Sequence, residues 1–366
     1  MKLEGIRVLD LSVFLPGPYM TMALADHGAE VIKIEMPGEG DPGRRIGLSD
    51  GEHTVFFRNL NRGKQSLVLD LKSESGRAEL LRLCGTADVF VEAFRPGVMA
   101  RLGLDYERVR AVNPRIVYCS ISAFGQQSAY VSRPAHDLAI EAMSGVLSIT
   151  LGDDGAPAIP GLPMADLLSG MQGLAGVLMA LLRRETTGVG DCLDISMLDS
   201  LVAACTNILG PTFAEGRQPI AKHERTTGGS SFYRLYRTSD GGHVAIAGQE
   251  PKFVEALLNA IGRPDLIGLV LQGPGPHQGP VAEVLGREFA RRTRAECERW
   301  LATLDVCFGS VCTLPEAFAD PNLVERGMLL RDDAGRPHIG SPIHFLAEPA
   351  RPNLRAPMLG ENALGG

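Results

Sequence analysis

The sequence predicts an α/β protein in which a large domain with a mostly parallel sheet is joined to a smaller α+β domain. Three patterns support this prediction. Short apolar runs alternate with helical patterns through the first 122 residues, longer helical patterns follow from Leu138, and an alternating hairpin pattern occupies 232–248. Alternation of strands and helices is typical of parallel sheets with helices on both faces.

The first elements form a β-α-β unit. The apolar run IRVLDLS at 6–12 predicts a buried strand, and PGPYMTMALADHG at 16–28 predicts a helix that ends at Gly28. AEVIKIE at 29–35 predicts the second strand. The alternation then repeats, with further strands predicted at 66–71, 87–93 and 115–122 and a helix at 74–85.

Beyond these strands the pattern becomes helical. We predict helices at 137–149, 166–184 and 197–209, with a strand at 192–196. The polar stretch 209–231, rich in Gly and Thr, predicts a linker. In 232–248, the alternation around Asp240-Gly241 predicts a β-hairpin. The predicted division is a large domain at 1–208, a linker at 209–231, a small domain at 232–330 and a C-terminal segment at 331–366 that returns to the large domain.

Charge and composition argue against several partners. The net charge of −7, from 36 basic and 43 acidic residues, provides no basic footprint for nucleic acid and no polybasic stretch for a membrane surface. The first residues do not form a secretory signal, and no run reaches the roughly 18 apolar residues that span a bilayer. Seven cysteines without a CxxC pair suit a reducing compartment. We therefore expect a cytoplasmic protein with free thiols.

Five strings, taken in their order and spacing, resemble the class III CoA-transferase (CaiB/BaiF) and α-methylacyl-CoA racemase family. The resemblance implies a Rossmann-like large domain and an interlocked homodimer, with an active site between the large domain of one chain and the small domain of its partner. It also implies an acyl-CoA substrate and no cofactor beyond the coenzyme A that this substrate carries. The strings are VLDLSVFLPGPYMTMALADHGAEVIKIE at 8–35, NRGKQSLVLDLK at 61–72, VEAFRPGVMARLGL at 91–104, NPRIVYCSISAFGQ at 113–126 and TTGVGDCLDISMLDS at 186–200.

Two adjacent candidates open a predicted helix, in Ala135-His136-Asp137. Backbone N–H groups are unpaired at a helix start, so Asp137 is either a cap or a catalytic carboxylate. In the transferase branch the resemblance makes Asp137 the nucleophile that becomes an aspartyl-CoA thioester. In the racemase branch it makes His136 one of two acid/base groups.

Two further acidic candidates lie elsewhere. Asp166 precedes an apolar helix pattern, where capping alone would explain it. The resemblance makes Asp166 the other acid/base group of racemases, and transferases also keep an aspartate there. Glu250 precedes Pro251, where a helix dipole would stabilise it. The string QEPKF resembles racemases, in which this glutamate pairs with the catalytic histidine, and it favours that branch.

Coenzyme A carries a 3′-phosphate and a pyrophosphate, which Arg and Lys side chains bind well. Exposed basic residues are otherwise usually just solvated. By resemblance, the candidates for the phosphates are Lys64, Lys72, Arg95 and Arg101, with Leu71 and Ala93 beside the adenine.

Three functions compete at this point. The lead is a 2-methylacyl-CoA racemase or epimerase, in which one group removes the α-proton and another returns it on the opposite face. The alternative is a CoA-transferase that moves CoA between carboxylic acids through Asp137. The third is a CoA-binding homologue without activity. The eight histidines include no HxH or HExxH spacing, so we expect no metal site.

Overall fold

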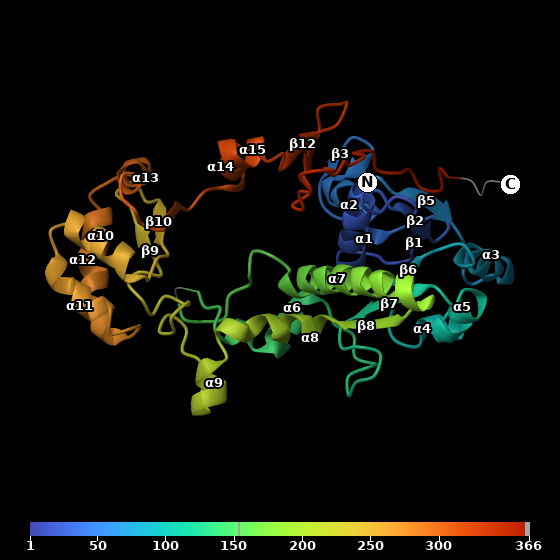
Figure 1. Cartoon of the computed structure of the whole chain (residues 1–366), viewed down its shortest axis with the longest axis horizontal. Coiled ribbons are helices and arrows are strands. Elements are labelled where there is room, and N and C mark those ends of the chain that lie inside the picture. Colours follow the sequence, from blue (N-terminus) through green and yellow to red (C-terminus); the bar gives the residue numbers. More distant parts are fainter. Residues whose placement is uncertain (153, 363–366) are drawn as a thin grey trace. The chain divides into compact units, whose positions relative to one another are not determined.

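The computed structural model describes residues 1–152 and 154–362. The chain divides into two compact units (Figure 1). The first consists of Met1–Ser144, Pro160–Ala203 and Phe318–Gly366, and the second of Gly145–Ile159 and Ala204–Ala317.

The first unit is built on a six-stranded sheet in which every neighbouring pair of strands is parallel. Counted along the chain within this sheet, the strand order is 3-2-1-4-5-6, which is the order of doubly wound Rossmann folds. The predicted fold class is therefore confirmed. The strands in spatial order are β5 (Gln65–Val68), β2 (Glu30–Glu35), β1 (Arg7–Asp10), β6 (Val89–Glu92), β7 (Val117–Ser122) and β8 (Cys192–Ser196).

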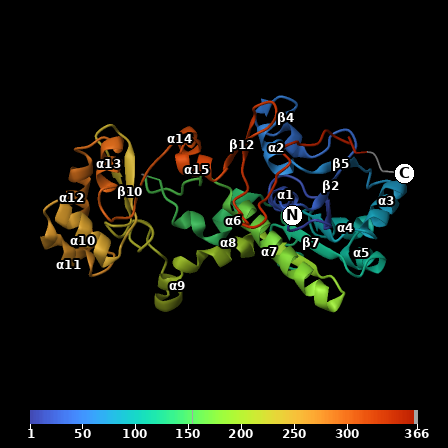
Figure 2. The same ribbon diagram turned by 45° about the horizontal axis from the view of Figure 1, so that its top comes forward.

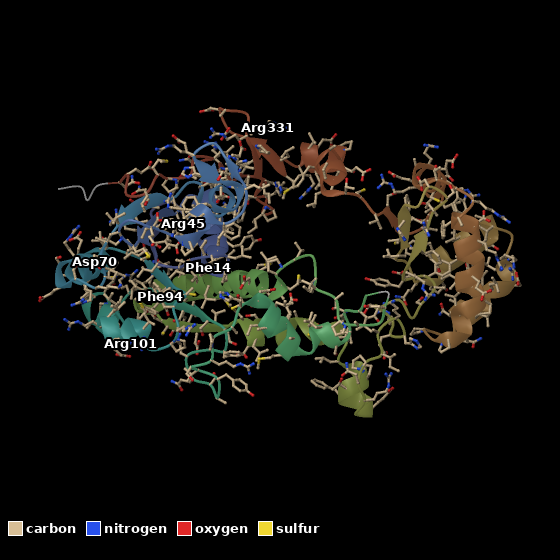
Figure 3. The ribbon with its side chains drawn as sticks, turned by 180° about the vertical axis from the view of Figure 1, so that it is seen from behind. Phe14, Arg45, Asp70, Phe94, Arg101 and Arg331 are labelled. Atoms are coloured by element: carbon tan, nitrogen blue, oxygen red, sulfur yellow. The ribbon has the colours of Figure 1, made fainter. Side chains whose placement is uncertain are left out.

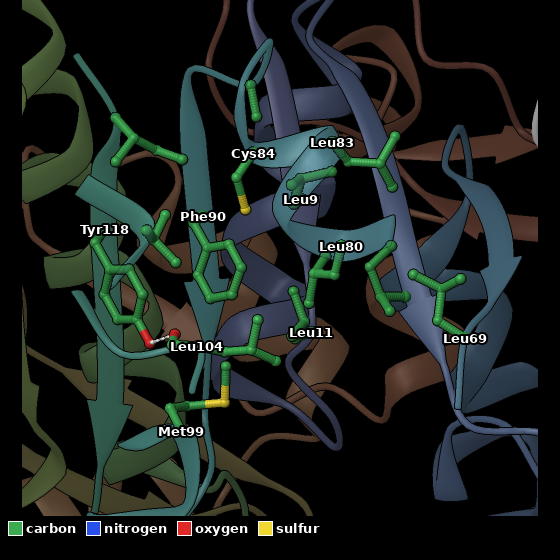
Figure 4. Packing of buried hydrophobic residues seen from close by; sticks show 14 of the residues in the cluster. Leu9, Leu11, Leu69, Leu80, Leu83, Cys84, Phe90, Met99, Leu104 and Tyr118 are labelled. Atoms are coloured by element: carbon green, nitrogen blue, oxygen red, sulfur yellow. Dashed lines mark hydrogen bonds between the residues drawn. The ribbon is translucent and has the colours of Figure 1, made fainter. Parts of the chain in front are cut away.

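Helices cover both faces of this sheet because successive strand residues point to opposite sides. Leu9 and Phe90 belong to the core beneath α3 (Glu74–Cys84) and α5 (Tyr106–Val112), which Figure 4 shows from close by. Their strand neighbours Val8 and Val89 belong to the opposite core, beneath α1 (Pro16–Asp26) and α7 (Met164–Thr187). Both cores are apolar, as buried parallel strands require.

Helices α1 and α7 lie side by side in both ribbon views (Figures 1 and 2). Small residues on α7 make this approach possible. A Cβ atom at Gly170 would lie 2.6 Å from the carbonyl oxygen of Pro16, and one at Gly173 would lie 2.8 Å from the sulfur of Met20. Both distances are too short for a side chain, so glycine brings the start of α7 against the start of α1.

The same helix corrects one expectation about membranes. Sequence analysis found no run that could span a bilayer, but the 24 residues of α7 are long and apolar enough by length and composition. The run of apolar residues in α7 is interrupted by Ser169 and Gln172, but its glycines, alanines and leucines keep the average composition apolar. A helix of a protein core passes the same test, and Val177 and Leu181 of α7 are buried in the first unit.

The remaining elements of the first unit are short. They surround the sheet and include two small antiparallel pairs of strands. They are α2 (Val55–Asn61), α4 (Val98–Leu102), α6 (Asp137–Ser144), α8 (Met197–Ala204), α15 (Pro321–Glu325), β3 (Ser49–Asp50) with β4 (His53–Thr54), and β12 (Leu329–Arg331) with β13 (Pro337–Ile339).

The C-terminal segment binds to the β5 side of the first unit. The N–H of Gly63 donates to the carbonyl oxygen of Arg355 at 2.8 Å, and the N–H of Ser66 donates to the Asn362 side chain at 2.9 Å. The N–H of Asn362 also donates to the carbonyl oxygen of Ser66 at 3.1 Å, so this segment adds a main-chain partner to the strand at the edge of the sheet.

The second unit contains a three-stranded antiparallel sheet, in the order β11 (Phe308–Ser310), β10 (His243–Ile246), β9 (Arg234–Arg237). The predicted hairpin at Asp240-Gly241 joins β9 and β10, and Gly241 has a positive φ of 81° that suits glycine. Phe232, Leu257 and Phe289 are buried in this unit's core. Its helices are α9 (Gly210–Glu215), α10 (Pro251–Ala260), α11 (Ile267–Val270), α12 (Gly279–Phe289), α13 (Arg294–Leu301) and α14 (Leu314–Phe318), the last of which ends at the unit boundary.

The unit boundaries differ from the predicted domains, and residues 318–330, predicted in the small domain, group with the first unit. Residues 145–159 group with the second unit, where the Gln218 amide donates to the Ser148 hydroxyl at 2.7 Å. The stretch 209–231, predicted as a linker, contains α9 and several turns. Loop composition does not reveal a contact such as that of Gln218 with Ser148, which are 70 positions apart.

Candidate active site

A small pocket of about 300 Å³ lies at the carboxyl ends of β1, β6 and β7. Ligands of open parallel α/β sheets bind at this edge, where the strand order reverses. Pro16 comes from the start of α1, the stretch Ala93–Pro96 follows β6, and Ser122–Gly125 closes β7. His136 and Asp166 complete the lining.

A second, large pocket of about 620 Å³ adjoins the small one. It lies over the ends of β1, β2 and β5, and its lining includes Leu71 and Lys72. Val13 and Phe94 line both pockets, so the two pockets adjoin each other along the same edge of the sheet. Figure 3 labels Phe94 together with Phe14, which lines the small pocket only.

His136 is held at the wall of the small pocket by its backbone and by an aromatic neighbour. Its carbonyl oxygen accepts the N–H of Ala139 at 3.0 Å in the first turn of α6. Its ring meets the ring of Phe14 edge to face, with centroids 5.8 Å apart and planes at 85°. Phe14 has a φ of 64°, a left-handed conformation that strains a bulky residue. Sequence reasoning missed Phe14, because no sequence pattern marks a phenylalanine with positive φ.

Asp137 caps a helix, but not the one it begins. Its Oδ1 accepts the backbone N–H groups of Ala165 at 2.8 Å and of Asp166 at 3.1 Å, both in the first turn of α7. An acidic oxygen at this position satisfies orphan donors and favours the positive end of the helix dipole. Asp137 therefore links the starts of α6 and α7, and its carboxylate is engaged there.

Asp166 lies in the first turn of α7 and lines the small pocket. Burial, together with the negative charges of Asp137 and Glu141, raises the pKa of Asp166 to about 7. A carboxyl group with a pKa near neutrality can both take and give a proton at neutral pH. The raised pKa therefore makes Asp166 a candidate acid or base of this pocket.

Glu141 is the third member of a carboxyl cluster with Asp137 and Asp166. Sequence reasoning missed this residue. Its side chain is 1% exposed, and Oε1 accepts the N–H of Met164 at 3.1 Å. Burial raises the pKa of Glu141, and the neighbouring Asp137 raises it further. The four-residue spacing from Asp137 to Glu141 puts both side chains on one helix face, so this spacing was the available signal.

Lys64 lies inside the first unit, with no exposed side-chain surface. Its ammonium group donates to Asp10 at 2.9 Å, to Thr21 at 2.8 Å and to Asn61 at 2.9 Å. Burial lowers the pKa of Lys64 to about 8, although Asp10 opposes this effect. These contacts join β1, α1 and α2, so Lys64 has a structural role that the sequence did not indicate.

The chain matches the model of CoA-transferase family III over residues 3–363. It belongs to this family. The succinate–glutarate CoA-transferase of Agrobacterium fabrum is 33% identical over an alignment that covers 98% of this chain and 93% of the relative. The α-methylacyl-CoA racemase of Homo sapiens is 34% identical, covering 99% of this chain and 91% of the relative. The crystal structure of a CAIB/BAIF family protein from Brucella suis has a TM-score of 0.83 and 30% identity, covering 98% of this chain and 96% of that one.

Family membership confirms the resemblance noted in the sequence and makes the chain an enzyme of the CoA-transferase and racemase family. Most of the CoA-binding candidates lie along the pocket edge. Leu71 and Lys72 line the large pocket, whereas Ala93 and Arg95 line the small one. Arg101 is exposed on α4, whose residues Val98 and Leu102 line the large pocket. Their contacts with CoA stay predictions.

Glu250 belongs to the second unit, whereas His136, Asp137 and Asp166 belong to the first. It is the N-cap residue of α10, with Pro251 at the first helical position. Its carbonyl oxygen accepts the N–H of Phe253 at 3.0 Å, but its side chain makes no capping bond. The carboxylate is thus not required by its own helix, and its pairing with His136 stays a prediction.

No cluster of three or more His, Cys, Asp or Glu side chains that could hold a metal ion occurs within residues 1–152 and 154–362. Among the three carboxyls of the site, those of Asp137 and Glu141 accept helix N–H groups, and that of Asp166 lines the small pocket.

Proposed function

We propose that this enzyme racemises or epimerises 2-methylacyl-CoA thioesters by removing and returning the proton at Cα. One observation carries the proposal: His136 and Asp166, an imidazole and a carboxyl with a pKa near 7, line the same small pocket. An α-proton can be exchanged on two faces only if two groups able to hold a proton flank the carbon.

In this mechanism His136 takes the α-proton from one face, and the protonated carboxyl of Asp166 delivers a proton to the other. The reverse reaction exchanges their roles. A pKa near neutrality serves both directions, since Asp166 must be an acid in one and a base in the other. Negative charge develops on the thioester oxygen as the enolate forms, and the start of α1 at Pro16 lines the pocket with the positive end of its dipole.

The two pockets divide the substrate by its chemistry. Phe14, Phe124 and Met197 give the small pocket an apolar wall that suits a branched acyl chain. The large pocket, which both Leu71 and Lys72 line, suits the nucleotide portion, with Leu71 beside the base. We place the phosphates near Lys72, Arg95 and Arg101, and we no longer include Lys64, whose donors are already used within the protein.

The decisive experiment follows solvent deuterium into Cα of a panel of single-enantiomer 2-methylacyl-CoA thioesters, with no acceptor acid present. We expect deuterium incorporation together with loss of optical purity. If no panel member exchanges, while CoA moves between two added carboxylic acids, the racemase proposal is wrong.

CoA transfer is the second candidate, and the similarity to a succinate–glutarate CoA-transferase over 98% of this chain favours it. The resemblance gave the nucleophilic role to Asp137, but Asp137 is engaged by two helix N–H groups. In this candidate we assign the role to Asp166, which lines the pocket.

The transfer would begin when the Asp166 carboxylate attacks the thioester carbonyl carbon and the CoA thiolate leaves, which gives a mixed anhydride. The thiolate then attacks the aspartyl carbonyl carbon and releases the free acid, leaving an aspartyl-CoA thioester. Mass spectrometry of the enzyme mixed with acyl-CoA distinguishes the candidates. A CoA adduct on Asp166 supports transfer, and deuterium exchange without an adduct supports racemisation.

A further inference from the structure

The first turn of α7 is surrounded by three carboxyl groups that come from two helices. Asp137 and Glu141 of α6 accept its backbone N–H groups, and Asp166 of α7 itself is the third. Glu141 is the most deeply buried of the three, at 1% exposure. It serves neither the proposed proton transfer nor the pocket lining.

The Oε2 atom of Glu141 is buried and has no hydrogen-bond partner among the described residues. An unsatisfied buried oxygen is costly, and more so if it carries charge. The neighbouring group is the carboxyl of Asp137, whose negative charge raises the pKa of Glu141. Two carboxyls can share a hydrogen bond only when one of them keeps a proton, and such a proton would satisfy Oε2.

The charges around the cluster agree with a retained proton. The groups that act on Asp166 are the negative charges of Asp137 and Glu141, and Asp137 is the charged group that acts on Glu141. No lysine or arginine of the described residues offsets them at either position. His136, Arg95 and Arg133 also line the small pocket with Asp166, but none of them is among the groups that shift the pKa of Asp166. Like charges this close do not all ionise together, and their titrations become coupled.

We propose that Glu141 is a positioning residue: by sharing a proton with Asp137 and Asp166, it keeps Asp166 able to act as an acid at neutral pH. Its second task is to fix the first turn of α7 through the N–H of Met164. The consequence for catalysis rests on the proposed racemase function, but the sharing of the proton does not.

The test is a titration that needs no turnover. The full-length enzyme is labelled with aspartate carrying ¹³C at the side-chain carboxyl, and the Asp166 signal is assigned by its loss in Asp166→Asn. Its midpoint is then compared between wild type and Glu141→Gln. The Gln amide can still accept from Met164 and donate to Asp137, so the fold is preserved while one ionisable carboxyl is removed, and the fully ionised cluster then carries one negative charge fewer. Glu185→Gln, at the exposed far end of α7, is the matched control.

We expect Glu141→Gln to lower the Asp166 midpoint by about one pH unit, and Glu185→Gln to leave it unchanged. An equal midpoint in wild type and Glu141→Gln would overturn the proposal. If Glu141→Gln does not fold, infrared spectra of the wild type and of Asp166→Asn still test the proposal. The wild type at neutral pH should show the carbonyl stretch of a protonated buried carboxyl that Asp166→Asn weakens, and its absence from the wild type would also overturn the proposal.

Kinetic measurements distinguish a failure of the shared-proton proposal from a failure of the proposed racemase function. If the pH profile of α-proton exchange moves with the NMR midpoint in Glu141→Gln, both are supported. If the midpoint moves but no α-proton exchange occurs at any pH, the shared proton stands and the racemase proposal fails.

Discussion

The carboxylate of Asp137 accepts the backbone N–H of Asp166 at 3.1 Å, so the two acidic candidates are joined through the first turn of one helix. Asp137 also accepts the N–H of Ala165. The contact gives Asp137 two effects on its neighbour: it fixes the position of Asp166, and its charge disfavours ionisation of Asp166. Because these effects depend on different properties of Asp137, substitutions can separate them.

We expect Asp137→Ala to destabilise the protein by about 0.5–2 kcal/mol, the usual cost of losing a helix cap. Asp137→Asn should recover much of this loss, because its amide oxygen can still accept the N–H groups of α7. Both variants remove the negative charge, so both should lower the pKa of Asp166. Urea unfolding gives the stabilities, and ¹³C titration gives the pKa. Equal stability of Asp137→Ala and wild type would show that the cap contributes nothing.

The raised pKa of Asp166 predicts how stability depends on pH. The folded protein holds the Asp166 proton up to about pH 7, whereas the unfolded chain releases it near the ordinary aspartate pKa of 3.8. Folded protein thus binds more protons between these values, and this group's contribution to stability falls as the pH rises through that window. Asp166→Asn removes the titration.

The free energy of unfolding of Asp166→Asn minus that of wild type should therefore be more positive at pH 8 than at pH 4. Urea unfolding at both pH values measures this difference. The exposed Asp333→Asn is the control and should show no such change. A constant difference between Asp166→Asn and wild type across this range would contradict the raised pKa.

The candidate site shows what sequence can and cannot predict. The start of α6 at Asp137 followed from local pattern, because helix starts favour acidic residues. The partner of Asp137 did not, because Ala165 is 28 residues away and the contact depends on how two helices pack. The parallel sheet was predictable from hydrophobic runs whose strands alternate with helices. Residues 145–159 were misassigned because a loop's unit is set by contacts such as that of Gln218 with Ser148.

Lys64 shows the same limit for charged residues. Its place in a family string suggested a phosphate ligand, but Asp10 and Thr21, 54 and 43 positions away, surround its ammonium group. Nothing local distinguishes a buried lysine from an exposed one, since its burial depends on the packing of α1 against the sheet. Lys72, in contrast, is exposed at the large pocket.

We expect Lys72→Ala and Arg101→Ala to weaken CoA binding by about 1.5–3 kcal/mol each, the scale of a hydrogen bond to a charged group. Higher salt should reduce both effects, because exposed charges are screened. Isothermal titration with free CoA measures the dissociation constants. Arg110→Ala, which removes another exposed guanidinium from α5, should bind as wild type does. Unchanged constants for both test variants would remove them from the proposed phosphate site.

Helix α7 bears on the oligomeric state. Met171, Met179 and Leu182 are 54%, 65% and 75% exposed on it, which is unusual for large apolar side chains along one helix. We propose that a second copy of the chain covers this face in the expected homodimer. Light scattering of the wild type should give twice the 39.1 kDa chain mass, and Leu182→Glu should shift the enzyme toward monomer. A stable, active wild-type monomer at micromolar concentration would contradict the dimer.

His136 is the residue that separates the two reactions most sharply. If the enzyme is a racemase, His136→Ala removes the group that serves one face of Cα, so turnover should fall on the order of 10²–10⁴-fold. His344→Ala, at another exposed histidine, should leave turnover unchanged. If the enzyme is a transferase, His136→Ala should be mild, whereas Asp166→Ala should abolish both CoA transfer and any enzyme thioester that hydroxylamine can trap. A loss of turnover in Asp166→Asn alone fits either reaction, but a His136→Ala enzyme with wild-type α-proton exchange rates cannot be the proposed racemase.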